Sequence, residues 1–535
     1  MATPRVGCLF AVIACHLGHA HAYAHATRPS LPLNCRRATP PWSAAKQDDG
    51  RLEKNRAIDR QFVAIALPAL VQFAAEPLAG LVDTAYLGRL GASALGGAGV
   101  AISAHYATAK LFNDPLLRTS ISIVAQGDGA ASRQQASGDA EPSSARDEAI
   151  SAALVLALAA GLLQTAFFLV AAPSLVGGMG AGAGSSMRPI AISYLRVRAL
   201  GMPAATMWLV ANGIFRGLGD TRTPLLWALL FSGLNAVLDP IFIFPLGLGA
   251  AGAAAGTALS QSIALAGLLR VLQQRTGVAV SPLALLSPTN LRTLGPALAA
   301  YGQAGVLVFF RTWGKVIAYT YCSRRATELG AVASAAHLLC FNLGVLLSQL
   351  CESVAVATQT LLARAMGALR AAAAVAVDEQ ALTPESKSAK AAAREARADA
   401  WHVIKLGSLV GGTIAALLTG LTAFRPATVI AGLTTDGAVR AACGAIIGPV
   451  LCCQLFKGLA FPSNGVIMGG LDWSFASVEI WAGSLLCIAL VHARSPPTLV
   501  TIWIGLAAFM GAQTLMSVAR VASRTGPWAV LFDDT

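Results

Sequence analysis

Long apolar stretches separated by short polar turns make up most of the chain from Gln61 onward. Each stretch holds about twenty residues or more, which is the length that an α-helix needs to cross the hydrocarbon core of a bilayer. The pattern predicts an all-α polytopic membrane protein with twelve transmembrane helices. The predicted spans are 62–87, 94–117, 150–172, 193–215, 224–245 and 250–270 in the first half, and 295–321, 331–362, 401–423, 437–461, 473–491 and 498–519 in the second.

The two halves of this pattern repeat each other. LGASALGGAGV at 90–100 is echoed by LGAVASAAHLL at 329–339, and IFRGLGD at 214–220 is echoed by VIMGGLD at 466–472. Because six spans are an even number, both copies cross the membrane in the same orientation. We therefore expect two six-helix bundles related by a pseudo-two-fold axis along the membrane normal, with substrate passing between them.

The predicted domain organisation follows from these spans. Lysine and arginine gather at the span ends on the side of the N-terminus, so both termini are expected to face the cytosol-like or stroma-like compartment. The alanine-rich insert 371–400 is expected to be a partly helical, solvated loop. The predicted segments are a presequence and tail (1–60), an N-lobe (61–270), a linker (271–294), a C-lobe with the insert (295–520) and a C-terminal tail (521–535).

Composition excludes several classes of protein. Hydrophobic residues make up 55% of the chain and charged residues 12%, which a soluble protein of 535 residues would not show. The net charge of +13 comes from basic residues scattered over short loops, so no nucleic-acid partner is expected. The ten cysteines form no CxxC pair, and no metal site is expected. We expect a monomer whose partners are the bilayer and a small-molecule substrate.

The first sixty residues have the composition of a targeting segment. Arg5 precedes the apolar run Val6–Leu17, and A-x-A sites at 20–22 and 24–26 follow it, as in a cleavable signal peptide. The segment 27–46 is basic and lacks acidic residues, as in an organelle transit peptide. This order resembles the two-part presequence of algae whose plastids are reached through the secretory route, which favours a plastid membrane. Plain secretory entry followed by a disordered basic tail is the alternative, with the plasma membrane or another endomembrane as destination.

Carboxylates inside the apolar spans indicate the chemistry. Asp83 lies in span one, Asn235 and Asp239 lie one turn apart on one face of span five, and Thr257 lies in span six. A charge at bilayer depth costs about 2.5–3.5 kcal/mol on insertion scales, so such residues usually bind an ion or a proton. Two carboxylates with amide and hydroxyl oxygens suit a shared proton or a hard monovalent cation. A polar cluster that only holds helices together is the alternative.

Two prolines predict that span one bends. Pro68 and Pro77 each remove a backbone donor, and Gly80 adds flexibility. A bending helix that carries a titratable Asp83 would couple protonation to shape. A static kink is the alternative.

The second half predicts a cationic substrate cavity. Arg311 and Lys315 lie at i, i+4 in span seven and Glu352 lies in span eight, so the two cations could receive an organic carboxylate. Alternatively, Arg311 pairs with Glu352 and Lys315 reaches the membrane interface. Glu76 in span one and Asn212 in span four complete the predicted cavity.

The sequence Gly217-Leu218-Gly219-Asp220 requires a separate test, because G-x-G-D also marks intramembrane aspartyl proteases. Arg216 and Thr221 flank it, which places it in a polar turn between spans four and five, and no Tyr-Asp partner occurs in an apolar span. A helix-ending turn with Asp220 near the next N-terminus is therefore expected. The protease is the remote alternative.

These stretches resemble the multidrug and toxic compound extrusion (MATE) family, specifically its DinF-like branch, which includes plant and plastid members. The resemblance covers about 61–520. It implies two six-helix lobes in a V-shaped arrangement and cation-driven export of small organic molecules by alternating access, with H⁺ or Na⁺ as the coupling ion, no other cofactor and no enzymatic activity. The matching segments are ALP at 66–68, EPLAGLVDTAYLGRLG at 76–91, KLFNDPLL at 110–117, YLRVRALGMPA at 194–204, NGIFRGLGDTRTPL at 212–225, NAVLDPIFIF at 235–244, GAAGAAAGTALSQ at 249–261 and the weaker NGVIMGGLD at 464–472.

The resemblance also carries site residues. In archaeal members of this branch, the first-lobe cation site uses an aspartate of helix one, an asparagine and an aspartate of helix five, and a threonine of helix six. The matching positions are Asp83, Asn235, Asp239 and Thr257, and Pro68 matches the proline at which helix one bends.

The resemblance to the NorM branch is weaker. The acidic pair that binds sodium in its second lobe is not reproduced, because span seven has Arg311 and Lys315 instead. Plant relatives include exporters of citrate and other organic acids, which implies an organic anion or a xenobiotic as substrate. A lipid-linked precursor flippase of the same superfamily is the alternative.

Overall fold

A computed structural model describes residues 41–137, 144–179, 182, 184–378, 384–434, 436–494 and 497–532. The chain divides into two compact units, Met1–Lys54 and Asn55–Thr535. The predicted signal and transit segments fall almost entirely on residues 1–40, which lie outside the described residues. The arrangement given below is that of the second unit.

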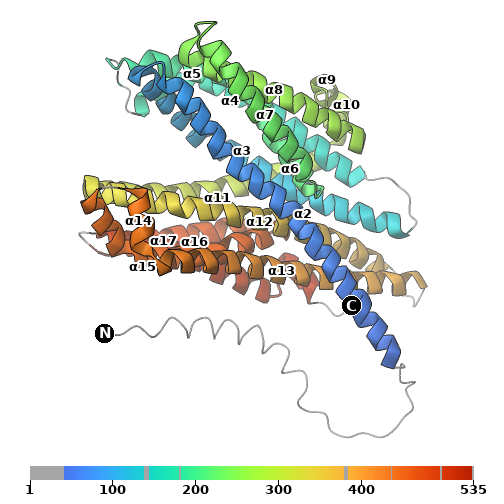
Figure 1. Ribbon diagram of the computed structural model, residues 1–535. Coiled ribbons are helices and arrows are strands. Elements are labelled where there is room, and N and C mark those ends of the chain that lie inside the picture. Colours follow the sequence, from blue (N-terminus) through green and yellow to red (C-terminus); the bar gives the residue numbers. More distant parts are fainter. Residues whose placement is uncertain are drawn as a thin grey trace, which may run out of the picture. The chain divides into compact units, whose positions relative to one another are not determined.

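The described residues form helices and turns without a strand, in two bundles that follow each other along the chain (Figure 1). Two short helices, α9 (Pro282–Leu285) and α10 (Pro288–Thr293), connect the bundles. The first bundle contains α2 (Pro41–Gly88), α3 (Ala92–Ser137), α4 (Ser144–Gly178), α5 (Met187–Leu200), α6 (Met202–Gly217), α7 (Arg222–Ile243) and α8 (Gly249–Thr276). The second contains α11 (Gly295–Glu328), α12 (Ala331–Asp378), α13 (Pro384–Phe424), α14 (Pro426–Leu433), α15 (Gly437–Gly469), α16 (Trp473–His492), α17 (Leu499–Ala522) and the 3₁₀ segment η1 (Gly526–Leu531).

Each of the twelve predicted spans coincides with helix in the described part of the chain. Among the described residues, eight helices are long and apolar enough, by length and composition, to cross a membrane: α4, α7, α8, α12, α13, α15, α16 and α17. The fourth span consists of α5 and α6, which have 14 and 16 residues and are each too short alone. The remaining spans are α2, α3 and α11, whose apolar runs contain charged residues. The predicted twelve-helix fold class is therefore retained.

The fourth span is interrupted at Gly201, which the sequence prediction missed. Pro203 lies in the first turn of α6, where its missing N–H breaks the backbone ladder of the preceding helix. A Cβ at Gly201 would lie 2.7 Å from the Cβ of Ala258 on α8. The interruption therefore occurs where α5 and α8 approach closely.

The internal repeat predicted from the sequence appears as two equivalent helix contacts. In the first bundle, a Cβ at Gly217 of α6 would lie 2.8 Å from the carbonyl oxygen of Ile121 on α3. In the second bundle, a Cβ at Gly469 of α15 would lie 2.9 Å from the carbonyl oxygen of Gln359 on α12. Both glycines therefore permit backbone-to-backbone contact, at corresponding positions of IFRGLGD and VIMGGLD.

Residues 371–378 and 384–400 of the insert are helix with a packed face, which corrects the expectation of a solvated loop. Helix α12 continues to Asp378 and α13 begins at Pro384. The physical reason is a run of alanines at helical spacing, which gives the insert an apolar face. The buried members are Ala372, Ala389, Ala393, Ala396 and Ala400. Ala372, Ala393, Ala396 and Ala400 belong to one hydrophobic cluster with Trp528 and Leu531 of η1, so the described part of the C-terminal tail is folded onto the second bundle.

Candidate functional site

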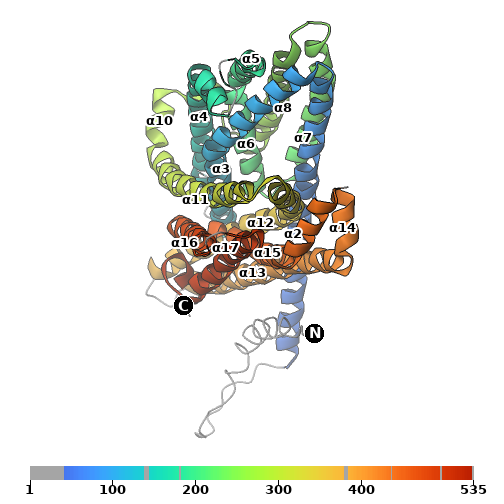
Figure 2. The same ribbon diagram turned by 90° about the vertical axis from the view of Figure 1, so that its left-hand side faces the viewer.

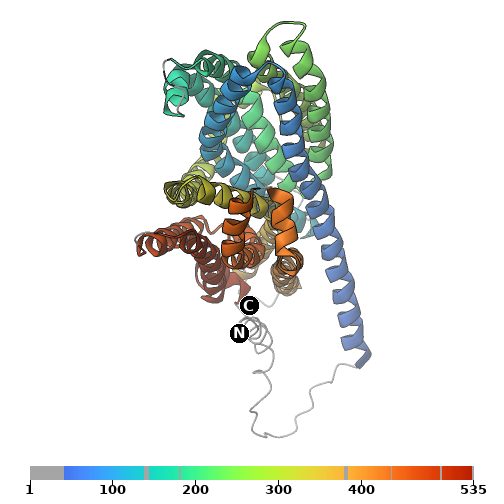
Figure 3. The same cartoon turned by 60° about the vertical axis from the view of Figure 1, so that its left-hand side comes forward.

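Three of the predicted coupling residues meet inside the first bundle, where α2 and α7 lie side by side (Figures 2 and 3). Asn235 Nδ2 donates hydrogen bonds to Asp83 Oδ1 at 2.8 Å and to Asp239 Oδ2 at 3.1 Å. Asn235 is 3% exposed and Asp239 is fully buried. The amide therefore bridges two carboxylates that come from different helices.

The site contains buried acceptors without donors. In the described part of the chain, Asn235 Oδ1 and Asp239 Oδ1 have no hydrogen-bond partner. A buried polar atom without a partner costs about 1–3 kcal/mol, so a ligand that satisfies it gains that energy. Oxygen acceptors that converge with a carboxylate suit a proton or a hard cation.

Thr257 is positioned differently from the other three. Its Oγ1 donates to the carbonyl of Ala253 on α8 at 2.9 Å. Among the described residues, no hydrogen bond joins Thr257 to the two acids. The hydroxyl of Thr257 can therefore offer an ion only its lone pairs. The structure brings the other three predicted residues, Asp83, Asn235 and Asp239, into direct contact.

The other predicted residues of the first bundle lie on α2 and α6. Asn212 is 2% exposed and accepts a hydrogen bond from Gln72 Nε2 at 2.7 Å, which joins α6 to α2, and its place in a substrate cavity stays a prediction. Pro68 lies within α2, which is continuous helix through that residue. The side chains of Glu76 and Pro77 lie outside the described residues.

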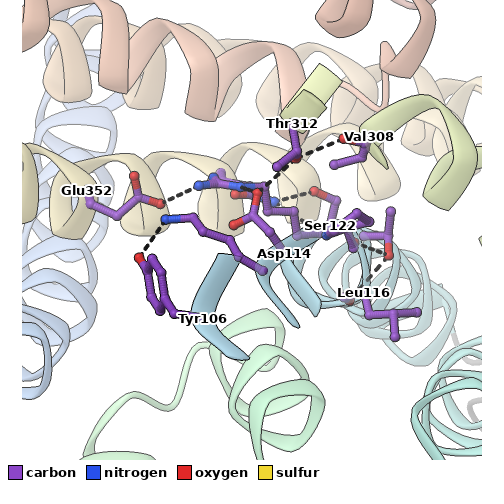
Figure 4. Close-up of polar contacts among 12 residues, drawn as sticks. Tyr106, Asp114, Leu116, Ser122, Val308, Thr312 and Glu352 are labelled. Carbon is purple, nitrogen blue, oxygen red and sulfur yellow. Dashed lines mark hydrogen bonds and ion pairs between the residues drawn. The ribbon is translucent and has the colours of Figure 1, made fainter. Parts of the chain in front are cut away.

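A second polar cluster connects the two bundles (Figure 4). Arg118 of α3 donates from Nε to Asp114 Oδ2 at 3.0 Å and from Nη2 to Glu352 Oε1 of α12 at 3.1 Å. Thr312 Oγ1 of α11 lies 3.3 Å from Asp114 Oδ2, to which it can donate a hydrogen bond. We call this set and the cations beside it, Lys110, Arg311 and Lys315, the interlobe cluster.

The alternative in which Arg311 pairs with Glu352 is not found among the described residues, where Glu352 pairs with Arg118. Arg311 is 3% exposed, and its Nε has no hydrogen-bond partner among the described residues. Lys315 is half-buried, with its ammonium 5.5 Å from the ring centroid of Phe461 on α15. Glu352 of α12 therefore pairs with a cation of the first bundle. Within the described ranges, Arg311 and Lys315 have no carboxylate at salt-bridge distance.

Three members of the interlobe cluster were missed by the sequence interpretation. Lys110, Asp114 and Arg118 were noted only as part of, or next to, the motif KLFNDPLL. With Tyr106, to which Lys110 donates at 2.9 Å, they recur every four residues and so lie along one face of α3. This spacing was the signal that could have identified them. The cluster contains four cations (Lys110, Arg118, Arg311 and Lys315) and two carboxylates (Asp114 and Glu352), which is an excess that suits an anion.

The bundles are joined on one side of the interlobe cluster. Gln359 Nε2 of α12 donates to Ser122 Oγ of α3 at 2.7 Å, and Arg364 of α12 pairs with Asp128 of α3 at 2.8 Å. Helix α11 also runs beside α3 and α12 (Figure 2). We call this side the joined end. At the opposite ends, which carry α5 and α14, the ribbons diverge (Figure 1).

The G-x-G-D sequence forms a turn, as predicted. Asp220 accepts hydrogen bonds from the backbone N–H of Arg222 at 2.9 Å and of Thr223 at 3.0 Å, and it pairs with Arg275. Burial alone would raise the pKa of the Asp220 carboxyl, but hydrogen bonds from the hydroxyl and the backbone N–H of Thr223, together with Arg275, lower it overall. Asp220 is therefore held as a carboxylate that caps α7, which does not suit an acid–base pair.

Comparisons with known proteins agree with this architecture. The MatE family model matches residues 68–241. Protein DETOXIFICATION 44, chloroplastic, of Arabidopsis thaliana is 32% identical over 478 residues, which cover 89% of this chain and 84% of the relative. Protein DETOXIFICATION 45, chloroplastic, of the same plant is 30% identical over 88% of this chain and 80% of the relative.

Two solved structures share the fold. A MOP superfamily transporter from Pyrococcus furiosus superposes with a TM-score of 0.67 at 20% identity, covering 89% of this chain and 97% of that one. The MATE transporter VcmN of Vibrio cholerae superposes with a TM-score of 0.70 at 15% identity, covering 90% of this chain and 99% of that one. The arrangement of two six-helix bundles is therefore common to all three chains.

Proposed function

Because this chain belongs to the MATE family, whose members are membrane transporters and not enzymes, we propose that it exports small organic molecules in exchange for H⁺ or Na⁺. The observation that carries the proposal is the separation of opposite charges: two carboxylates bridged by Asn235 inside the first bundle, and an excess of cations between the bundles. A coupling cation and an anionic substrate would each find a complementary site. Membership of the DinF-like branch stays a prediction.

The coupling step is assigned to Asp83 and Asp239. Their bridge leaves buried oxygen atoms unpaired, and these can accept a proton or coordinate Na⁺. Binding of the ion would neutralise the site and change the packing of α2 against α7. A ligand moves a conformational equilibrium only through its different affinities for the two states, so the ion must bind one state of α2 more tightly.

The substrate is assigned to the interlobe cluster. Lys110 and Lys315 make no ion pair among the described residues, whereas Arg118 is engaged by Asp114 and Glu352. Ammonium groups that lie beside aromatic rings and have no ion-pair partner in the described part of the chain suit a carboxylate that carries an apolar or aromatic body. We therefore place organic anions ahead of cationic xenobiotics as substrates.

The transport cycle is proposed to alternate between two openings. The contacts at the joined end close one side of the interlobe cluster in this conformation. Export then requires a second state in which these contacts break and the opposite ends approach. The glycine contacts within each bundle would keep the bundles intact during that change.

A plastid membrane is the proposed location. Relatives of 32% and 30% identity are named as chloroplastic proteins. The order of signal-like and transit-like segments before residue 61 agrees with plastid targeting through the secretory route.

The proposal is tested by transport in proteoliposomes. We expect uptake of labelled citrate or an aromatic carboxylate to depend on an imposed proton or sodium gradient. Lys110→Gln and Lys315→Gln are each expected to raise KM for the anion about tenfold or more, because a hydrogen bond to a charged group contributes about 1.5–3 kcal/mol. Their ion dependence should stay that of the wild type.

Matched controls separate the outcomes of this test. Arg425→Gln removes an exposed arginine distant in sequence from the cluster and should leave KM unchanged. Transport of an organic cation dye without any anion would contradict the substrate class but retain the exporter. An absence of gradient dependence with every substrate, in folded protein, would reject the exporter and favour the lipid-linked precursor flippase.

Gly256→Ala is expected to impair ion coupling. A Cβ at this position of α8 would lie 2.2 Å from Asp239 Oδ1 and 3.2 Å from its Cα, so the carboxylate must move. Overpacking of this kind costs about 1–3 kcal/mol, and we expect at least a fivefold loss of gradient-driven transport. The control is Gly233→Ala on α7, where an added Cβ meets nothing within 4 Å. Equal activities of the two variants would contradict the assignment of Asp239.

A further inference from the structure

A pocket opens on the surface of α13, on the segment that continues the membrane span beyond the joined end. Its volume is about 410 Å³, and Arg394, Arg397, Ala398 and Trp401 line it. It lies in the insert and is separate from both polar sites described above. Its two guanidinium groups and indole ring give it a cationic and aromatic lining.

The pocket belongs to a basic face of α13. Lys390, Arg394, Arg397, Trp401 and Lys405 follow one another at steps of four, three, four and four residues, which places them along one side of the helix. The buried alanine face of the insert lies beside it, about 100° around the helix, because Ala389, Ala393, Ala396 and Ala400 each precede a member of the basic face by one residue. Packing of that face against the second bundle therefore fixes the direction in which the basic face points.

The acidic residues of this helix do not neutralise the pocket. Glu395 directly follows Arg394, and Asp399 lies two residues after Arg397. Both acids therefore point about 100° or more around the helix from Arg394. Both have interaction partners. Arg394 makes no hydrogen bond or ion pair within the described ranges, so its guanidinium is available for a ligand.

The C-terminal segment holds the other two side chains in place. Arg397 Nε donates to the carbonyl of Val530 at 3.2 Å, which leaves its two terminal amino groups for another acceptor. The ring of Trp401 meets the ring of Phe532 edge to face, with centroids 5.4 Å apart. A ligand would thus meet a partly preorganised arginine and a fixed indole, which lowers the entropy cost of binding.

The position of Trp401 identifies the kind of ligand. It is the first residue of the apolar stretch 401–423, so it lies where the helix enters the bilayer. Tryptophan is enriched at this depth, and basic residues just outside a transmembrane helix attract anionic headgroups. Arginine pairs with phosphate through two parallel N–H groups. We propose that this pocket binds the phosphate-bearing headgroup of an anionic membrane lipid, with Arg394 and Arg397 on the phosphate and Trp401 beside the glycerol.

The proposal predicts selective stabilisation by an anionic lipid. The full-length protein in neutral detergent is titrated with phosphatidylglycerol or with phosphatidylcholine, and thermal unfolding and native mass spectrometry are recorded. We expect phosphatidylglycerol alone to raise the unfolding temperature and to remain bound. Each basic side chain near a membrane contributes about 1 kcal/mol to such binding, which corresponds to about a fivefold loss of affinity for Arg394→Gln or Arg397→Gln and about 25-fold for both.

Two further measurements distinguish the lipid from other ligands and from a structural effect. Arg292→Gln, which removes an exposed arginine on α10, should bind phosphatidylglycerol as the wild type does. Phosphatidylglycerol with brominated acyl chains should quench the wild type more than Trp401→Phe, which a merely structural role of Trp401 would not produce. Equal stabilisation by glycerol phosphate, equal affinity of the arginine variants, or equal quenching would each overturn the proposal.

Discussion

Replacing Asp239 with asparagine is expected to abolish gradient-driven export while the protein stays folded. The amide keeps the shape of the carboxylate but cannot take up a proton or balance the charge of a cation. Interactions with a charged group contribute about 1.5–3 kcal/mol, so ion affinity should fall by about 10- to 150-fold. Asp83→Asn should act in the same direction, because Asn235 links both carboxylates. Proteoliposome transport under proton and sodium gradients measures the effect.

Asp239→Asn is expected to leave the stability of the fold intact although it abolishes transport. Asp239 Oδ1 is a buried atom that no described residue satisfies, so a neutral amide in its place should not lower the thermal unfolding temperature. Asp59→Asn is the matched control, because its carboxyl is 46% exposed and pairs only with His402 among the described residues. Wild-type gradient dependence in Asp239→Asn would remove the coupling role of the site, and unfolding would show that its role is structural.

Gly129→Ala and Gly367→Ala are expected to destabilise the joined end. A Cβ at Gly129 of α3 would lie 2.1 Å from the carbonyl oxygen of Arg364 on α12, and one at Gly367 would lie 2.2 Å from the carbonyl oxygen of Gln126. Both contacts involve backbone, so no side-chain movement relieves them. Each added methyl group should destabilise the joined conformation by about 1–3 kcal/mol. Its population relative to the separated conformation should therefore fall about fivefold or more.

The loss of the joined conformation can be measured by the rate of thiol labelling. Ser122 is fully buried in the joined end, so a Ser122→Cys reporter should be protected in the parent protein and labelled faster when Gly129 or Gly367 is alanine. Gly448→Ala on α15, where an added Cβ meets nothing within 4 Å, is the control for a general effect of the substitution. Unchanged labelling in both glycine variants would show that the bundles do not separate at this end.

The residues of the first-bundle site could be predicted because local rules fix their positions. Asn235 and Asp239 share one helix face by spacing alone, and a carboxylate in an apolar span such as Asp83 requires a polar neighbour, which the Asn235 amide supplies. Thr257 was grouped with them, but its hydroxyl bonds to its own helix. Sequence spacing shows which face a residue occupies, and it does not show which acceptor a hydroxyl chooses.

The interlobe cluster could not be predicted in the same way. Glu352 has several cations within possible reach, and the choice of Arg118 depends on how the two bundles meet, which no local pattern encodes. The partner of Asn212 could not be predicted for a related reason, because Gln72 lies 140 residues earlier in the chain. The packing of the insert was missed because its many charged residues obscured the alanine face beneath them.

The bond between Arg118 and Glu352 has a consequence for leakage. It joins α3 to α12, as the contact between Asp114 and Thr312 joins α3 to α11, so separation of the bundles in the proposed cycle would break both. An empty carrier would then leave several partly buried charges without partners, which is costly. A bound anion could replace the lost carboxylate and offset that cost. The cluster would therefore oppose futile turnover, in which ions flow down their gradient without substrate leaving.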